Sequence, residues 1–203
     1  MTKEEEIIIA AEDEFFRNGY DACSTAIIAK RAGVTHAMVN YYFRSKEKLF
    51  CRILDNHVYG LLQSLKPLMH ADGNVANVAM EAAGVIFDKM NEDRRFPYLL
   101  IDISRTHPDF LQRYKEALDG VCRDSLEMHD IRLKGNISEG LVRECRMSDI
   151  YNSVITLAAT PFVMLPFLEN VAGIEPARID GWLASRKEEM LKLIRARYSA
   201  QTG

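Results

Sequence analysis

The chain has 203 residues, of which 48% are hydrophobic and 27% charged, and its formal net charge at pH 7 is −3. This composition excludes an intrinsically disordered protein and suits one medium-sized domain, or a small domain with a larger one. The slight negative charge excludes a strong overall positive field, so attraction to nucleic acid would have to come from a local gathering of basic residues.

Such a gathering follows an acidic start. Residues 2–21 carry seven acidic and two basic side chains, whereas residues 25–52 carry six basic side chains and one acidic one. Duplex DNA carries one phosphate charge per roughly 1.7 Å of its axis, so a local basic surface matters more than the total charge. An ordinary solvated face is the alternative that composition alone favours. The six basic residues are Lys30, Arg31, Arg44, Lys46, Lys48 and Arg52.

The cysteines and the first residues indicate a cytoplasmic protein. A chain with this much apolar material does not need disulfides to fold, and no C-x-x-C pair is present, so free thiols are expected. The opening Met-Thr-Lys-Glu-Glu-Glu lacks the apolar segment of a secretory signal. The four cysteines are Cys23, Cys51, Cys122 and Cys145.

Helical patterns dominate, and the first expected helix runs from about Lys3 to Asn18. Thr2 and Glu5 have the spacing of a capping box at its start, and Gly19 supplies a left-handed residue at its end. No strict alternation of apolar and polar residues lasts more than a few positions, which argues against a sheet.

Two short helices follow. Ser24 is the expected N-cap of the first, which ends at Gly33, and Thr35 is the expected N-cap of the second, which runs to about Phe43. Both caps have side-chain oxygens that can accept from backbone N–H groups at the helix start.

Six longer segments complete an all-α fold of about nine helices. Ser45 caps the first of them, and Pro67 is expected to stop it. The other five are expected at residues 74–92, 97–105, 108–134, 148–170 and 176–199.

One apolar stretch has the length of a membrane span. Residues 150–168 contain no charged side chain, and a spanning helix needs roughly 17–25 residues. Pro161 and Pro166 would each interrupt the backbone hydrogen bonds, for which hydrocarbon offers no substitute. We therefore interpret this stretch as a helix buried between subunits and expect no membrane partner.

Residues 24–43 have the organisation of a helix-turn-helix, with the turn at Ala32-Gly33-Val34-Thr35. Gly33 permits a sharp turn, and the small side chain of Ala29 permits the two helices to approach closely. The second helix would expose polar or small side chains, which suit base edges and phosphates in a major groove about 12 Å wide. The segment therefore predicts binding to double-stranded DNA.

The residues around this motif resemble a known family. Residues 27–50 read Ile-Ile-Ala-Lys-Arg-Ala-Gly-Val-Thr-His-Ala-Met-Val-Asn-Tyr-Tyr-Phe-Arg-Ser-Lys-Glu-Lys-Leu-Phe, after Ala10-Ala11, Phe15-Phe16 and Gly19-Tyr20. This pattern, over about residues 7–52, resembles the N-terminal domain of the TetR family of bacterial repressors. The resemblance implies a DNA-binding domain at residues 1–50 and a helical domain at residues 51–203 for effector binding and dimerisation.

The resemblance also implies which residues contact DNA. The start of the first short helix would present hydroxyl and amide groups to phosphate, and the first turn of the second would enter the major groove. The family more often has tyrosine at the position of Asn40 and glycine at that of Ala37, so the bases that are read stay open between a contact to adenine and one to phosphate. The implied set is Ser24, Thr25, Thr35, His36, Ala37, Asn40, Tyr41, Tyr42 and Lys46.

Several of these residues also have a simpler interpretation. Phe43, spaced one turn from Val39, is expected to be a core aromatic, and Tyr41 and Tyr42 could be either core residues or DNA contacts. Lys46 could be a solvated charge, although the motif favours a phosphate contact at the start of the next helix.

No other motif carries chemistry. The histidines form no H-E-x-x-H or H-x-x-x-H pair, and no Walker loop, dinucleotide fingerprint or G-x-S-x-G element is present. We therefore expect no metal, no cofactor and no catalytic residues.

An effector pocket is expected within residues 74–170. Asp102 and Arg105 could face a ligand or form a local ion pair. The other candidate lining residues, which could equally be plain core, are Phe87, Met90, Tyr98, Ile101, Tyr114, Leu118, Tyr151, Ile155 and Met164.

The expected homodimer pairs residues 150–168 with the last helix. The face of that helix is expected to comprise Trp182, Leu183, Met190, Leu191 and Ile194. Following the resemblance, the function is a repressor that binds a near-palindromic operator and is released by a small-molecule effector. Two rivals are a DNA-binding regulator without a small-molecule ligand and an all-helical enzyme in which the helix-turn-helix is incidental.

Overall fold

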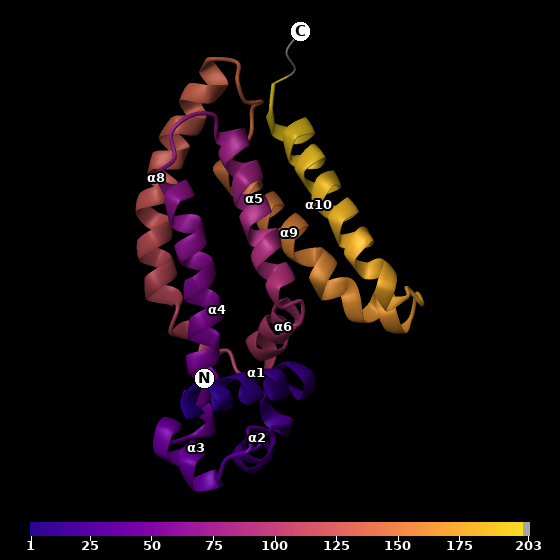
Figure 1. Cartoon of the computed structure of the whole chain (residues 1–203). Coiled ribbons are helices and arrows are strands. Elements are labelled where there is room, and N and C mark those ends of the chain that lie inside the picture. The colour runs from indigo at the N-terminus through magenta and orange to yellow at the C-terminus, as the bar shows by residue number, and fades with distance from the viewer. Residues whose placement is uncertain (201–203) are drawn as a thin grey trace. The chain divides into compact units, whose positions relative to one another are not determined.

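The structure is a computed structural model that describes residues 1–200, with the backbone alone for residues 117–126. These residues form ten helices, nine of them with seven or more residues (Figure 1). They contain no strand, and their one extended pairing is an isolated bridge between Val142 and Ser199. The all-α prediction is confirmed. The helices are α1 (Lys3–Ala22), α2 (Thr25–Arg31), α3 (His36–Phe43), α4 (Lys46–Met69), α5 (Val75–Glu92), α6 (Phe96–Thr106), α7 (Asp109–Gln112), α8 (Lys115–Ser138), α9 (Met147–Asn170) and α10 (Pro176–Tyr198).

The predicted helix starts are confirmed by their capping bonds. The hydroxyls of Thr2, Ser24, Thr35 and Ser45 each accept from the backbone N–H three residues later, at distances between 3.1 and 3.3 Å. At α1 the Glu5 carboxylate accepts in return from the Thr2 backbone N–H at 2.8 Å, which completes the capping box.

Three predicted boundaries differ from the structure. Gly19 has φ 78° and interrupts α1, but helical backbone resumes and runs on to Ala22. Pro67 lies inside α4, which continues for two residues to Met69, so the proline does not stop the helix where the sequence predicts. The single helix predicted over residues 108–134 is two helices, the short α7 and the longer α8.

The chain divides into two compact units. Unit 1 comprises Met1–Leu62 and Tyr98–Gln112, and unit 2 comprises Gln63–Pro97 and Arg113–Gly203. Two of the divisions fall inside α4 and α6, and the third falls in the turn between α7 and α8. The functional domains expected at residues 1–50 and 51–203 stay predictions, since they assign tasks rather than packing.

Unit 1 is built on an aromatic cluster. The rings of Phe15 and Phe50 meet edge to face at 4.9 Å, and Tyr20 lies 4.8 Å from Phe50. Phe110 of α7 packs on both Tyr20, at 4.9 Å, and Phe50, at 5.2 Å. Nε2 of His107 donates to the Asp21 carboxylate at 2.9 Å. These contacts bring residues 98–112 into the same unit as the helix-turn-helix.

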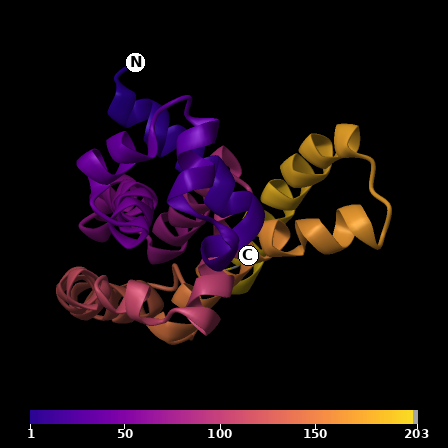
Figure 2. The ribbon, with the colours of Figure 1, turned by 90° about the horizontal axis from the view of Figure 1, so that it is seen from below.

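Unit 2 is a bundle in which α5, α9 and α10 pack on one another and α8 packs on α5 and α9 (Figures 1 and 2). Phe87 and Phe162 meet at 4.8 Å between α5 and α9. The buried hydroxyl of Tyr198 donates to the Asp149 carbonyl at 2.7 Å and lies 2.6 Å from the Ser153 hydroxyl, which ties α10 to the start of α9.

Helix α9 is long and apolar enough to cross a membrane by length and composition, with a mean hydropathy of 1.4 over its best window. One such helix is weak support for a span, because a bundle helix passes the same test. In unit 2 its inner face is buried and its outer face is not, with only 28% of that window buried. The buried residues are Met147, Ile150, Val154, Ala158, Phe162 and Leu165.

Candidate DNA-binding site

The turn between α2 and α3 has the geometry that the sequence predicts. Gly33 has φ 64°, a left-handed conformation that costs glycine little, and the Val34 N–H donates to the Ala29 carbonyl at 3.0 Å. Ile28 and Ala29 of α2 and Val39 of α3 are buried where the two helices pack. The turn therefore holds α3 against α2 by its inner face.

The outer face of α3 is exposed. The side chains of Thr35, His36, Ala37 and Asn40 all lie in solvent, and no charged residue occurs in the helix. His36 begins α3 and reaches the start of α2, where its Nε2 lies 2.8 Å from Thr25 Oγ1. On the other side of the ring, Nδ1 lies 3.4 Å from Asn40 Nδ2. Three of the predicted DNA-binding residues are thus joined in one hydrogen-bonded row.

The aromatic residues of α3 separate into two kinds. Phe43 is 7% exposed, so its predicted role as a core aromatic is confirmed. Tyr41 is 71% exposed and Tyr42 is 40% exposed, and their rings meet edge to face at 5.3 Å. The core interpretation therefore does not describe these two tyrosines, whose rings are available at the surface.

Lys46 is held inside unit 1. Its ammonium donates to the backbone carbonyls of Tyr20 at 3.0 Å and Cys23 at 3.1 Å, and lies 4.1 Å from the centre of the Tyr20 ring. Burial raises the pKa of the Tyr20 hydroxyl, with Glu47 contributing in the same direction. Burial likewise raises the pKa of the Cys23 thiol to about 11. The phosphate contact expected for Lys46 stays a prediction, and this internal contact was not foreseen.

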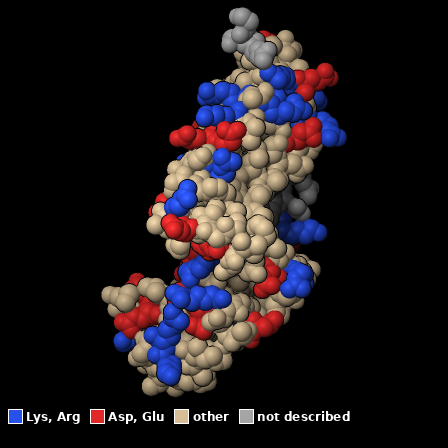
Figure 3. Space-filling model, turned by 90° about the vertical axis from the view of Figure 1, so that its right-hand side faces the viewer, with Lys and Arg blue, Asp and Glu red and all other residues tan. Residues whose placement is uncertain are grey.

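The basic residues of the segment are partly neutralised. Arg31 donates to Glu14 at 2.8 Å and also bonds Asp13, which fixes α2 to the acidic α1. The acidic run of α1 could have signalled this partner. Besides Arg31, the exposed cations of the segment are Lys30, Arg44, Lys48 and Arg52. Figure 3 shows basic side chains in a band over the lower part of the molecule, with acidic side chains beside them.

Arg44 has a backbone conformation that was not predicted from the sequence. It caps the end of α3 with φ 65° and is the non-glycine residue of the described chain with positive φ. Its N–H donates to the Asn40 carbonyl at 3.0 Å. A positive φ costs a residue with a Cβ roughly 1–2 kcal/mol of conformational free energy. The connection between α3 and α4 therefore includes a strained backbone position.

The residues predicted for an effector pocket are distributed over both units. Phe87, Met90 and Tyr114 are buried in unit 2, and Tyr151 is half-buried there. Ile155 and Met164 lie on the exposed face of α9. Leu118 lies outside the residues whose side chains the structure describes. The remaining four, Tyr98, Ile101, Asp102 and Arg105, belong to unit 1.

Within that last group, Tyr98 and Ile101 are exposed. Arg105 lies 3.5 Å from Asp102 on the same helix, which is the local ion pair weighed for these two residues. Asp102 also lies 3.6 Å from the position that a Cβ would take at Gly19.

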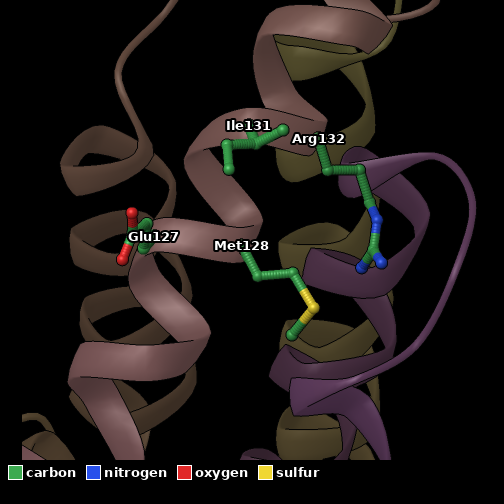
Figure 4. Close-up of a pocket in the computed structure, with 4 residues that line it drawn as sticks. All are labelled: Glu127, Met128, Ile131 and Arg132. Carbon is green, nitrogen blue, oxygen red and sulfur yellow. The ribbon is translucent and has the colours of Figure 1, made fainter.

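Unit 2 has a surface pocket of about 480 Å³ along α8, lined by Glu127, Met128, Ile131 and Arg132. Met128 and Arg132 point toward the end of α4 and the loop after it (Figure 4). There Arg132 bonds the Ala71 carbonyl and, at 2.8 Å, the Asp72 carboxylate. None of the predicted pocket residues is among these four.

A buried polar pair lies beside this pocket and includes the residue that follows Met128 on α8. His129 of α8 is 8% exposed, and its Nδ1 lies 2.7 Å from the Tyr151 hydroxyl of α9. Its Nε2 is buried and has no hydrogen-bond partner among the described residues. Burial lowers the pKa of this imidazole, and the nearby charge of Arg132 lowers it further.

The residues predicted for a dimer surface differ in how far they are buried within the protomer. Leu183, Met190 and Ile194 are buried within the protomer, so they have no surface left for a partner, because the face of α10 that they share packs on α5 and α9. Trp182 and Leu191 are half-buried. Within the protomer the most apolar face of α10 belongs to the core, and the dimer surface stays a prediction.

In the described residues, which are helical throughout, α3 follows α2 after a glycine turn and has an exposed outer face. This arrangement defines a helix-turn-helix protein. Residues 7–53 match the model of the bacterial regulatory proteins of the tetR family. The match covers the helix-turn-helix and the helices on either side of it, so this part of the chain is similar to the regulators of that family.

Three similar proteins illustrate the relationship. The transcriptional activator FasR of Mycolicibacterium smegmatis is 29% identical over 147 residues, which are 68% of this chain and 66% of that protein. The ketosteroid transcriptional regulator KstR2 of Mycobacterium tuberculosis matches with a TM-score of 0.69 at 14% identity, over 98% of this chain and 96% of that one. A SmeT–triclosan complex matches with a TM-score of 0.60 at 20% identity, over 100% and 94%. The two structural matches establish likeness of fold.

Proposed function

We propose that this protein is a cytoplasmic homodimeric regulator that binds a near-palindromic operator through the exposed face of α3. The observation that carries the proposal is the exposed row of Thr25, His36 and Asn40, held by a buried α2–α3 contact. In a two-fold dimer the two recognition helices would enter successive major grooves, with half-site centres about 34–36 Å apart. The protein acts by binding DNA and carries out no catalysis in this scheme.

The dimer contact proposed is the uncharged outer face of α9, continued by α10. Met164, Phe167 and Val171 are exposed and follow one another at steps of three and four residues, so they lie on one side of the helix, which a two-fold axis can pair with its own copy. Burying these side chains together would remove apolar surface from water. The exposed apolar residues are Ile155, Met164 and Phe167 of α9, Val171 after it, and Leu193 of α10.

The dimer proposal is tested by light scattering on purified protein. Phe167 is 50% exposed on α9, and Phe167→Asp is expected to yield monomers because it would place two carboxylates at the paired face. Ile131→Asp is the matched control, since Ile131 is 66% exposed on a different helix, α8. Dimers that survive Phe167→Asp at micromolar concentration would refute this surface.

We also propose that a small apolar effector binds unit 2 and alters the DNA affinity of the dimer. Two structural neighbours, the ketosteroid regulator KstR2 and the SmeT–triclosan complex, support an apolar ligand class. A coupling of about 1–3 kcal/mol between the two sites would suffice. We propose α4 as one route for this coupling and residues 98–112 as a second, since Phe110 and His107 pack on Tyr20 of unit 1.

The effector and the direction of regulation need separate experiments. A thermal-shift screen of steroid-like and fatty acyl compounds is expected to give a stabilising ligand that also lowers operator affinity. A screen without any hit would favour the rival in which no small molecule is sensed. The FasR relative is named an activator. A reporter assay with the operator placed upstream or within a promoter therefore measures whether this protein represses, as expected for the family, or activates.

DNA binding itself is tested by selecting fragments from a random pool and measuring their affinity at several salt concentrations. We expect a two-fold symmetric consensus and a steep loss of affinity with salt, because basic side chains release counterions from phosphate. Failure to enrich any sequence, together with a flat salt dependence, would refute the proposed function.

A further inference from the structure

The position of the Asn40 amide gives the hydrogen bonds around His36 one direction in the structure. Nδ2 of Asn40 carries only donor hydrogens, so the His36 Nδ1 that it faces at 3.4 Å must accept. In a neutral imidazole the ring proton is then on Nε2, which donates to Thr25 Oγ1 at 2.8 Å. The Thr25 hydroxyl hydrogen is left over and is free to bond an outside acceptor.

The opposite direction is chemically possible in the same row. If the Thr25 hydroxyl donated to Nε2, the ring proton would lie on Nδ1, and Asn40 would have to turn its Oδ1 toward the ring. The two arrangements exchange the positions of the Asn40 amide donor and acceptor. They therefore present opposite hydrogen-bonding patterns to a base pair lying over Asn40.

A phosphate at Thr25 selects between these arrangements. A phosphate oxygen only accepts, so a Thr25 hydroxyl that donates to it can no longer donate to His36. Nε2 must then carry the proton, Nδ1 must accept, and Asn40 must keep its Nδ2 toward the ring, as the structure has it. The bonds would strengthen once DNA excludes water from these exposed side chains.

We propose that Thr25 and His36 are positioning residues that fix the orientation of the Asn40 amide and thereby set the base preference at the position it reads. In the fixed orientation, the N–H that lies on the Oδ1 side of the amide stays available together with Oδ1. That edge can pair with N7 and N6 of adenine. The phosphate contact at Thr25 and the base contact at Asn40 are in this way coupled through His36. This inference rests on the proposed DNA-binding function.

The test measures base discrimination separately from affinity. The selected operator is varied at each base pair, and the pair whose discrimination disappears in Asn40→Ala is the one read by Asn40. Discrimination there is expected to be about 5- to 150-fold in the wild type, the range of one bidentate contact. Thr25→Val, which keeps the shape and removes the hydroxyl, should reduce this ratio severalfold at that base pair alone. Thr25→Ser should restore it.

Combined variants show whether Thr25 acts through the ring. In the His36→Ala and Asn40→Ala backgrounds, Thr25→Val should leave the discrimination ratio unchanged, because the row is already broken. If Thr25→Val fails to fold by circular dichroism, His36→Ala alone should cause the same loss of discrimination. Equal weakening on every sequence with an unchanged ratio would overturn the inference. So would an Asn40→Ala protein that binds DNA with unaltered preference everywhere, whereas loss of all DNA binding by the wild type would refute the proposed function instead.

Discussion

The ammonium of Lys46 lies 4.1 Å from the centre of the Tyr20 ring and donates to the Tyr20 carbonyl at 3.0 Å. A second bond, to Cys23 at 3.1 Å, places the same ammonium across the segment between α1 and α2. The start of α4 is thereby fixed to the end of α1. One lysine closes the N-terminal three-helix arrangement on the side from which α4 leaves it.

Replacing Lys46 with alanine is therefore expected to affect both stability and DNA binding. Loss of two charge-assisted hydrogen bonds and a cation–π contact should lower the free energy of unfolding by about 1–3 kcal/mol, measured by urea denaturation. A phosphate contact by Lys46 predicts in addition that the salt slope of operator binding falls by about one. Lys48→Ala, at an exposed neighbour, is the matched control for stability. Reduced stability with an unchanged slope would leave Lys46 only the internal role.

The sequence could predict the caps and the turn but not the Lys46 contact, for a physical reason. Ser24, Thr35 and Gly33 act on backbone within a few residues, so their residue types and spacing suffice. Lys46 and Tyr20 are 26 positions apart, and only the packed fold brings them together. A lysine at a helix start carries no signal that distinguishes a phosphate from a carbonyl as its partner.

The same reasoning applies to the residues expected to line a pocket or a dimer surface. An apolar helical stripe indicates that a face is buried, but not whether the protomer or a partner buries it. On α10 the stripe of Leu183, Met190 and Ile194 is the protomer's own core, while Ile155 and Met164 of α9, expected to line a pocket, lie at the surface. The positions of the helices could be predicted from the sequence, but the element that each helix face packs on could not.

Arg44 offers a test of backbone conformation. Because its φ is 65°, Arg44→Gly is expected to be more stable to urea than Arg44→Ala by about 1 kcal/mol. Both variants remove the same exposed charge, so the difference between them isolates the Cβ. Equal stabilities, or a less stable glycine variant, would mean that the left-handed conformation at the end of α3 is not maintained in solution.

The buried thiol of Cys23 predicts sensitivity to alkali. Burial raises its pKa to about 11 from an ordinary value of 9.0, so the unfolded chain loses the thiol proton at a lower pH than the folded one. Stability from this group is complete below pH 9 and is lost as the pH rises toward 11. Cys23→Ala should therefore show a smaller loss of unfolding free energy than the wild type across this range. Indistinguishable pH profiles would contradict the burial of the thiol.

His129 predicts the opposite limb of the pH profile. Burial and the charge of Arg132 lower the pKa of its imidazole below the ordinary value of 6.5, and His70 acts in the same direction. Below pH 6.5 the unfolded chain binds a proton that the folded chain does not, so stability is present above that pH and declines as the pH falls. His129→Gln, which retains a hydrogen-bonding group for Tyr151 but cannot titrate, should lose less stability between pH 7 and pH 5. Because His129 packs in unit 2, far along the chain from the helix-turn-helix, the difference should appear in hydrogen exchange of α8 and α9 and leave that of α2 and α3 unchanged. A wild-type acid profile that His129→Gln reproduces would show that another group causes the decline and that the imidazole is already charged or solvated in the folded protein.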